Sequence, residues 1–149
     1  MYNFVINIHI VISSLFFLLA FFVVGLSVYK LTANKKFRSV DGLFGKGYLS
    51  FLYLQLISGS VLYFFLKPAD NPQIITLEQA IEKSELRFWA IEHLAMMIFA
   101  LTLAQIGYLF ISKSNSDKQK HRNTLFFYGF SLAVVTISTS IALVREGVI

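Results

Sequence analysis

Four apolar stretches, each long enough to cross a lipid bilayer, dominate this sequence. A transmembrane helix needs about 20 mostly apolar residues to cross about 30 Å of hydrocarbon. Four segments reach that length, and none carries an interior Lys, Arg or Asp. They run over residues 4–29, 48–66, 88–111 and 125–144. The sequence therefore predicts an all-α integral membrane four-helix bundle, formed as one domain over residues 1–149.

The composition agrees with a membrane protein and excludes several other classes. Of 149 residues, 56% are hydrophobic and only 14% are charged, whereas a soluble domain carries about 25% charged residues. The formal net charge is +5, but the basic residues lie between the apolar segments and form no stripe, so we expect no nucleic-acid partner. The chain has no cysteine, which excludes disulfides and thiolate metal sites.

The charges of the connecting segments predict an orientation in the membrane. The second connection is mixed and slightly acidic, whereas the first and third are strongly basic. By the positive-inside rule we expect both termini outside, in a bacterial inner membrane. The first apolar segment lacks a basic n-region and a small-residue cleavage site, so we expect a retained helix rather than a signal peptide. The basic residues of the two inner connections are Lys30, Lys35, Lys36, Arg38, Lys46, Lys113, Lys118, Lys120 and Arg122.

Outside the spans we expect one further helix and one loosely ordered loop. Helical spacing of apolar residues within 68–86 predicts a short amphipathic helix on the outer surface, before the third span. The polar segment 112–123 is expected to be a loose inner loop, with His121 solvated in it. Aromatic residues near the span ends predict interfacial belts: Tyr2, Tyr29, Tyr48, Tyr63, Trp89, Tyr108 and Tyr128.

Two histidines inside the spans are the leading candidates for a functional site, because a polar side chain in hydrocarbon is costly without a partner. His9 and His93 each follow the start of a span by five residues, which is about 7–8 Å below the outer boundary. Two imidazoles at one depth on different helices can bind a metal between them, and b-type haem is the expected guest. The alternative is that each imidazole hydrogen-bonds a neighbouring helix or a headgroup. A zinc or copper site is less favoured, because Glu92 lies about 100° around the helix from His93.

Other polar and small residues of the spans fit the same site or have simpler explanations. Lys67, Arg87 and Arg145 fall at outer span ends, where cations would pair with haem propionates. Gln55, near mid-membrane, is expected either to hydrogen-bond another helix or to contact a cofactor or quinone. Glu92 is expected to pair with Arg87 or Lys67, or alternatively to exchange protons with a quinone.

Small residues at helical spacing could make room for a planar cofactor or allow close packing of helices, and packing is the better explanation. On the third span they follow His93, and on the second Gly59 lies one turn from Gln55. The set on the third span is Met97, Ala100, Ala104 and Gly107, and the fourth span offers Thr136 and Ser140.

Three motifs carry a resemblance to a known family. They are Asn-Ile-His at 7–9, Tyr-Leu-Gln-Leu-Ile-Ser-Gly at 53–59 and Leu-Arg-Phe-Trp-Ala-Ile-Glu-His at 86–93. Together they resemble the small bacterial four-helix membrane proteins that are catalogued as cytochrome b-like. The resemblance implies haem held by His9 and His93, with Gln55 and the Arg87/Glu92/His93 cluster as recurring polar positions. Where that family has an Arg-Trp pair soon after the first histidine, this chain has Ser-Ser-Leu at 13–15.

A second resemblance is to the small four-helix protoporphyrinogen oxidases, which also open with a histidine in the first helix. That family implies a lysine inside the membrane, and no span of this chain contains one. We therefore expect a b-type cytochrome that transfers electrons near the outer face. The alternatives are a non-catalytic accessory or assembly subunit of a larger respiratory or redox complex, and an oxidase acting on a porphyrin or quinone. Homo-oligomerisation stays open.

Overall fold

The computed structural model is all-helical over the residues it describes, which are 1–66, 81–82 and 87–145. Helix α1 spans Tyr2–Thr32 and α2 spans Ser39–Phe64. A π-helical turn, η1 (Phe88–Glu92), runs directly into α5 (His93–Lys113). Helix α6 (Asp117–Asn123), the π-helical turn η2 (Thr124–Tyr128) and α7 (Gly129–Arg145) form one further continuous helix.

Among the described residues, four helices are long and apolar enough to cross a membrane, as the sequence predicts. They are the 31-residue α1, the 26-residue α2, the 21-residue α5 and the 29-residue helix formed by α6, η2 and α7. Large apolar side chains cover the outside of the bundle, and Leu18, Phe21, Phe99 and Phe130 are each about half exposed or more. Such a surface is unusual in soluble proteins but suits contact with lipid.

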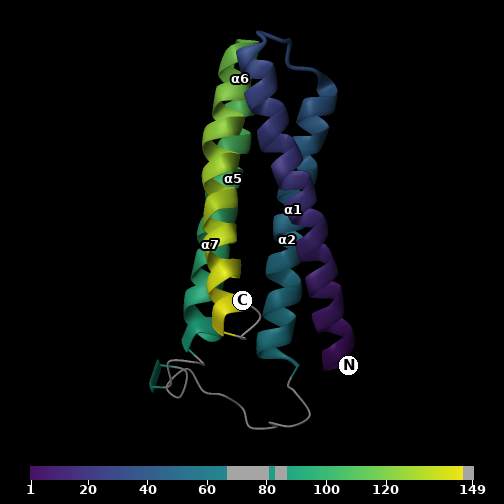
Figure 1. The fold of residues 1–149 in the computed structure, drawn as a ribbon, viewed down its shortest axis with the longest axis vertical. Coiled ribbons are helices and arrows are strands. Elements are labelled where there is room, and N and C mark those ends of the chain that lie inside the picture. The colour runs from purple at the N-terminus through teal and green to yellow at the C-terminus, as the bar shows by residue number, and fades with distance from the viewer. Residues whose placement is uncertain (67–80, 83–86, 146–149) are drawn as a thin grey trace.

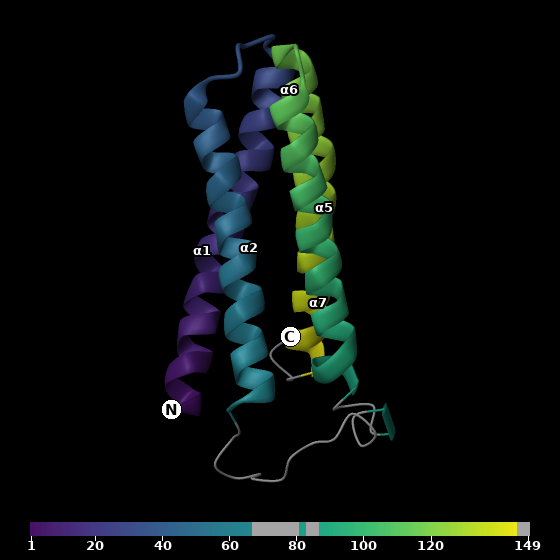
Figure 2. The same ribbon diagram turned by 180° about the vertical axis from the view of Figure 1, so that it is seen from behind.

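The four helices lie side by side, with both termini at the same end (Figures 1 and 2). Helix α1 pairs most extensively with α2, and α5 with α7; α2 also contacts α5, and α1 contacts the α6–η2–α7 helix. Helices α1 and α5 are therefore diagonal neighbours. We call the end formed by the start of α1, the end of α2, η1 and the end of α7 the histidine end. The opposite end, formed by the end of α1, the start of α2, the end of α5 and α6, is the basic end.

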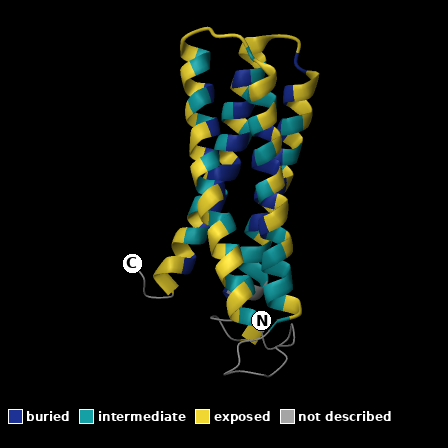
Figure 3. Ribbon diagram, turned by 90° about the vertical axis from the view of Figure 1, so that its right-hand side faces the viewer, coloured by how far each residue is buried: buried dark blue, intermediate teal, exposed yellow. Residues whose placement is uncertain are grey.

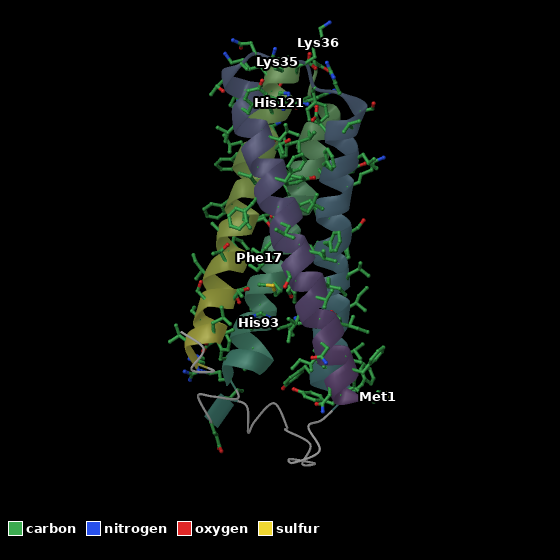
Figure 4. All side chains as sticks on the ribbon, turned by 45° about the vertical axis from the view of Figure 1, so that its right-hand side comes forward. Met1, Phe17, Lys35, Lys36, His93 and His121 are labelled. Atoms are coloured by element: carbon green, nitrogen blue, oxygen red, sulfur yellow. The ribbon has the colours of Figure 1, made fainter. Side chains whose placement is uncertain are left out.

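The basic end collects the positive charge of the connecting segments. All nine basic residues of the first and third connections lie there, as Lys35 and Lys36 illustrate in Figure 4. The segment 112–123 is not a loose loop, because α6 begins at Asp117, where the Ser116 hydroxyl accepts a hydrogen bond from the Gln119 N–H at 3.2 Å. The expectation that His121 is solvated is also wrong: the side chain is 1% exposed, and its ring centroid lies 5.1 Å from that of Phe37.

The tightest packing lies toward the basic end (Figure 3). On α1 the buried residues begin at Phe16, and on α2 they end at Gln55. Two tyrosines predicted for the interfacial belt, Tyr48 and Tyr128, are instead fully buried in this core. Fully buried Ser131 adds a hydrogen bond from its hydroxyl to the Ala100 carbonyl, at 2.8 Å, which joins α7 to α5.

Helix boundaries differ from the predicted spans mainly at the basic end. Helix α2 begins at Ser39, nine residues before the predicted span, because Asp41 caps it: its Oδ2 accepts the Arg38 N–H at 2.7 Å. The other end of α2 is Phe64, just short of the predicted 66. Apart from Ile81 and Glu82, which are helical, the amphipathic helix predicted within 68–86 lies outside the described residues.

Candidate functional site

His9 lies on α1 and is held by α2. Its Nδ1 atom is 2.7 Å from the hydroxyl oxygen of Ser58. Gly59, the next residue of α2, lets the helix backbone approach the imidazole, since a Cβ atom there would lie 3.4 Å from Cε1 of His9. The Ser13 hydroxyl donates to the His9 backbone carbonyl at 2.8 Å. The half-buried ring of His9 is therefore oriented by a side chain and a close backbone contact from the neighbouring helix.

His93 is the first residue of α5, directly after the π-helical turn η1. Its Nδ1 atom is 2.8 Å from the hydroxyl oxygen of Ser138 on α7, and Ser138 is fully buried. The ring of Phe88, also fully buried, lies 5.9 Å from the imidazole centroid. π-Helical turns of this kind often occur at functional sites. Figure 4 shows His93 toward the histidine end of the bundle.

The two histidines are held in matching ways. Each lies on one of the two diagonal helices, and each has its Nδ1 within hydrogen-bond distance of a serine on a neighbouring helix. His9, Ser58 and Ser138 lie six or seven residues from the end of their helices at the histidine end, and His93 lies five residues after the start of η1. At 1.5 Å per residue this is a common depth of about 8–10 Å.

Gln55 is buried on α2, one helical turn from Gly59 toward the middle of the bundle. Among the described residues its Nε2 atom has no hydrogen-bond partner, so the expected interhelical hydrogen bond is not formed through Nε2. A buried amide donor without a partner costs about 1–3 kcal/mol. Such a group on the approach to a site is a candidate ligand contact.

The predicted cationic residues are spread around the histidine end. Arg87 is exposed, and its Nε atom donates to a carboxylate oxygen of Glu92 at 3.0 Å, which is one of the two pairings expected for that acid. The Arg145 guanidinium lies 4.7 Å from the Phe88 ring centroid and so links the end of α7 to η1. Lys67 lies outside the described residues.

Sequence reasoning missed both serines of the site. On the fourth helix it singled out Thr136 and Ser140, but the Thr136 hydroxyl bonds its own helix backbone and Ser140 is exposed. The buried face carries Ser131 and Ser138 instead. Their seven-residue spacing, the repeat of a packed helix interface, is the signal that would have identified them. On α5 the predicted small-residue face is buried as expected: Met97, Ala100, Ala104 and Gly107.

Chemically, the site offers two imidazoles and no third ligand. Within residues 1–66, 81–82 and 87–145, no group of three His, Cys, Asp or Glu side chains is placed to hold a metal ion. No protein-family model, curated protein or solved structure matches the chain. The site is therefore interpreted from its own geometry.

Proposed function

We propose that this chain is a multi-pass membrane protein that holds one b-type haem between α1 and α5 and transfers electrons near the histidine end. The observation that carries the proposal is the matched pair of histidines. Each is fixed through Nδ1 by a serine hydroxyl of a neighbouring helix, at one depth and on diagonal helices. Ligating histidines typically use the second ring nitrogen in this way, which orients the ring for coordination through Nε2.

The residues present fit such a group in three further respects. Histidine is a standard ligand of haem iron, and the site contains two imidazoles on different helices. Gly59 places no side chain beside the His9 ring, since an added Cβ atom would lie 3.4 Å from Cε1 of His9. The buried Nε2 of Gln55 is a donor for a polar edge of the ligand. When bound between two histidines, haem accepts and returns a single electron.

The chain's own residues would bind and orient the group. His9 and His93 would hold the haem iron through their second ring nitrogens, and Ser58 and Ser138 would fix the tautomers of the two imidazoles. Within the described residues Arg87 contacts Glu92 through Nε, so its other guanidinium N–H groups are the proposed contact for a propionate. The same role for Lys67 stays a prediction from the sequence, because Lys67 lies outside the described residues. By the positive-inside rule we further propose that the basic end faces the cytoplasm of a bacterial cell. The histidine site would then lie near the outer face of the inner membrane.

The decisive experiment is a reduced-minus-oxidised absorption spectrum of the protein purified from haem-replete cells. We expect b-type bands in the wild type and in His121→Gln, which removes the third histidine far from the site. His9→Ala and His93→Ala should each abolish the bands while keeping the helical circular dichroism of the wild type. Bands that survive in both variants, or no bands in the wild type, would reject the haem proposal. A cofactor-free protein that co-purifies with a stoichiometric partner would favour the accessory-subunit alternative.

A further inference from the structure

A cavity of about 160 Å³ opens at the basic end, far from the histidines. It lies between the start of α2, the end of α5 and the α6–η2 segment. Much of its wall is apolar or aromatic, from Phe37, Tyr108, Ile111 and Tyr128. Since this end of the bundle is where the apolar spans give way to the basic connections, the cavity lies at the level of the lipid headgroups in the proposed membrane arrangement.

Two lysines from different helices line this cavity. Lys46 comes from α2 and Lys120 from α6. Lys120 is half-buried, and its ammonium lies 5.5 Å from the ring centroid of Phe37, which itself forms part of the wall. Neither lysine forms an ion pair with a carboxylate in the described part of the chain. Both charges are therefore available to a ligand.

The one acid in the wall, Asp41, does not cancel this charge. Its Oδ1 atom is paired with the Lys30 ammonium at 2.5 Å, and its Oδ2 accepts the Arg38 backbone N–H at 2.7 Å. The Asp41 side chain is only 7% exposed. Because both carboxylate oxygens are engaged inside the fold, Lys46 and Lys120 give the cavity a net positive charge.

Two glycines keep the space open. A Cβ atom at Gly45 would lie 3.3 Å from the Tyr128 hydroxyl oxygen, so the residue allows the tyrosine to approach α2. At Gly42 a Cβ atom would meet only the Phe37 ring, at 3.9 Å. A side chain at position 42 can therefore be accommodated, and it would occupy the space beside Phe37.

We infer that this cavity binds the phosphate-bearing headgroup of an anionic phospholipid. Unpaired lysines supply the charge for a phosphate, and basic pockets between transmembrane helices are known to take acidic headgroups. The apolar wall offers no favourable contact to a free inorganic anion, but it can pack against the glycerol and upper acyl chain of a lipid. This inference rests on the proposed membrane insertion and is independent of haem.

The test is native mass spectrometry of the detergent-purified protein with added phosphatidylglycerol, using phosphatidylcholine of the same acyl chains for comparison. We expect selective retention of one phosphatidylglycerol. Each lysine near a membrane surface is expected to raise the affinity for an anionic lipid about fivefold. The double variant Lys46→Gln/Lys120→Gln should therefore lower the apparent affinity for phosphatidylglycerol about 25-fold. The matched control, Lys36→Gln/Lys113→Gln, removes two lysines from the same end that do not line the cavity, and should bind as the wild type does.

A second variant, Gly42→Leu, tests the cavity without changing its charge and should also lower phosphatidylglycerol binding. It keeps the inference testable if the double lysine variant fails to fold. Equal loss in the lysine variant and its control, or equal retention of phosphatidylcholine, would overturn the site. Competition of phosphatidylglycerol by millimolar inorganic phosphate would show an anion site that is not specific for lipid, and would overturn the choice of ligand.

Discussion

Tyr48 and Tyr128 are joined by a reciprocal contact between α2 and the fourth helix of the bundle. Their rings stack with centroids 4.5 Å apart, at an interplanar angle of 14°. The Tyr48 hydroxyl donates to the Tyr128 backbone carbonyl at 3.0 Å, and the Tyr128 hydroxyl donates to the Gly45 carbonyl at 3.3 Å. Both side chains are fully buried. The pair therefore fastens the two helical hairpins to each other near the basic end.

Removing either hydroxyl of this pair should destabilise the bundle. We expect Tyr48→Phe to lower the free energy of unfolding by about 1 kcal/mol, because a buried carbonyl loses a hydrogen bond. Tyr128→Phe should cost less, since its hydrogen bond is longer. Unfolding in mixed detergent micelles measures both. The control is Tyr53→Phe, whose hydroxyl bonds Gln105 on the exposed surface and should change stability little. Equal losses at all three positions would show that the buried pair is not special.

Gly107 should tolerate no side chain. An added Cβ atom would lie 2.4 Å from Cβ of Phe127, which is fixed to its backbone and cannot rotate away. We expect Gly107→Ala to destabilise the protein by about 1–3 kcal/mol through forced helix separation. Gly25→Ala is the matched control, since nothing lies within 4 Å of its added Cβ, and it should be neutral or slightly stabilising. Thermal melting in detergent compares the two, and a neutral Gly107→Ala would contradict the observed approach of α5 to η2.

The Lys30–Asp41 pair predicts an asymmetry between single and double substitutions. Both side chains are largely buried, at 15% and 7% exposure. Asp41→Ala should cost about 3 kcal/mol or more, because it leaves the Lys30 ammonium without a partner and removes the cap of α2. The double variant Lys30→Met/Asp41→Ala should recover part of that loss. A double variant no more stable than Asp41→Ala would indicate that the cap alone matters.

Loss of the serine hydroxyls should weaken the proposed haem site without removing a ligand. Ser58→Ala and Ser138→Ala each delete the group within hydrogen-bond distance of a histidine Nδ1. We expect each to lower haem affinity about 10- to 100-fold, measured by transfer of haem to an acceptor protein. Ser14→Ala is the control, because its exposed hydroxyl bonds only its own helix. Unchanged haem retention in both site variants would show that the serines do not position the ligands.

The absence of cysteine makes the orientation directly testable. Single cysteines at Asn3 and Asn115, both exposed, probe the histidine end and the basic end. We expect a membrane-impermeant maleimide to label Asn3→Cys in intact spheroplasts and Asn115→Cys only after permeabilisation. The reverse pattern would place the histidine site on the cytoplasmic side.

Much of the fold was predictable, because a helix that crosses a bilayer needs a certain length and an apolar composition, and both can be read directly from the sequence. The four spans and the segregation of basic residues follow from that constraint alone. The positions of Tyr48 and Tyr128 did not follow. A tyrosine near the end of a span looks like an interfacial anchor until the helix is seen to continue, as α2 does toward Ser39 and the fourth helix toward Asp117.

The candidate site was predictable only in its histidines. Their rarity inside apolar segments drew attention, whereas serines are common in such segments and often bond their own helix, as Ser13 and Ser27 do here. Ser58 also donates to its own helix, at the Gln55 carbonyl. What sets Ser58 and Ser138 apart is an imidazole of another helix within hydrogen-bond distance, which depends on rotation about the helix axis. His121 shows the same limit, since a polar neighbourhood in the chain gave no sign that Phe37 would cover its ring.

The buried tyrosine pair holds the fourth helix near the basic end, and the remainder of that helix extends from this point to the histidine end. Tyr128 and Ser138 lie on one continuous helix, about 15 Å apart along its axis, so a tilt of about 4° at the tyrosines moves the histidine level by about 1 Å. Such a tilt displaces the Ser138 hydroxyl, which lies 2.8 Å from Nδ1 of His93. We therefore expect substitutions at the tyrosine pair to alter the Ser138–His93 contact, although no residue of the histidine end is changed.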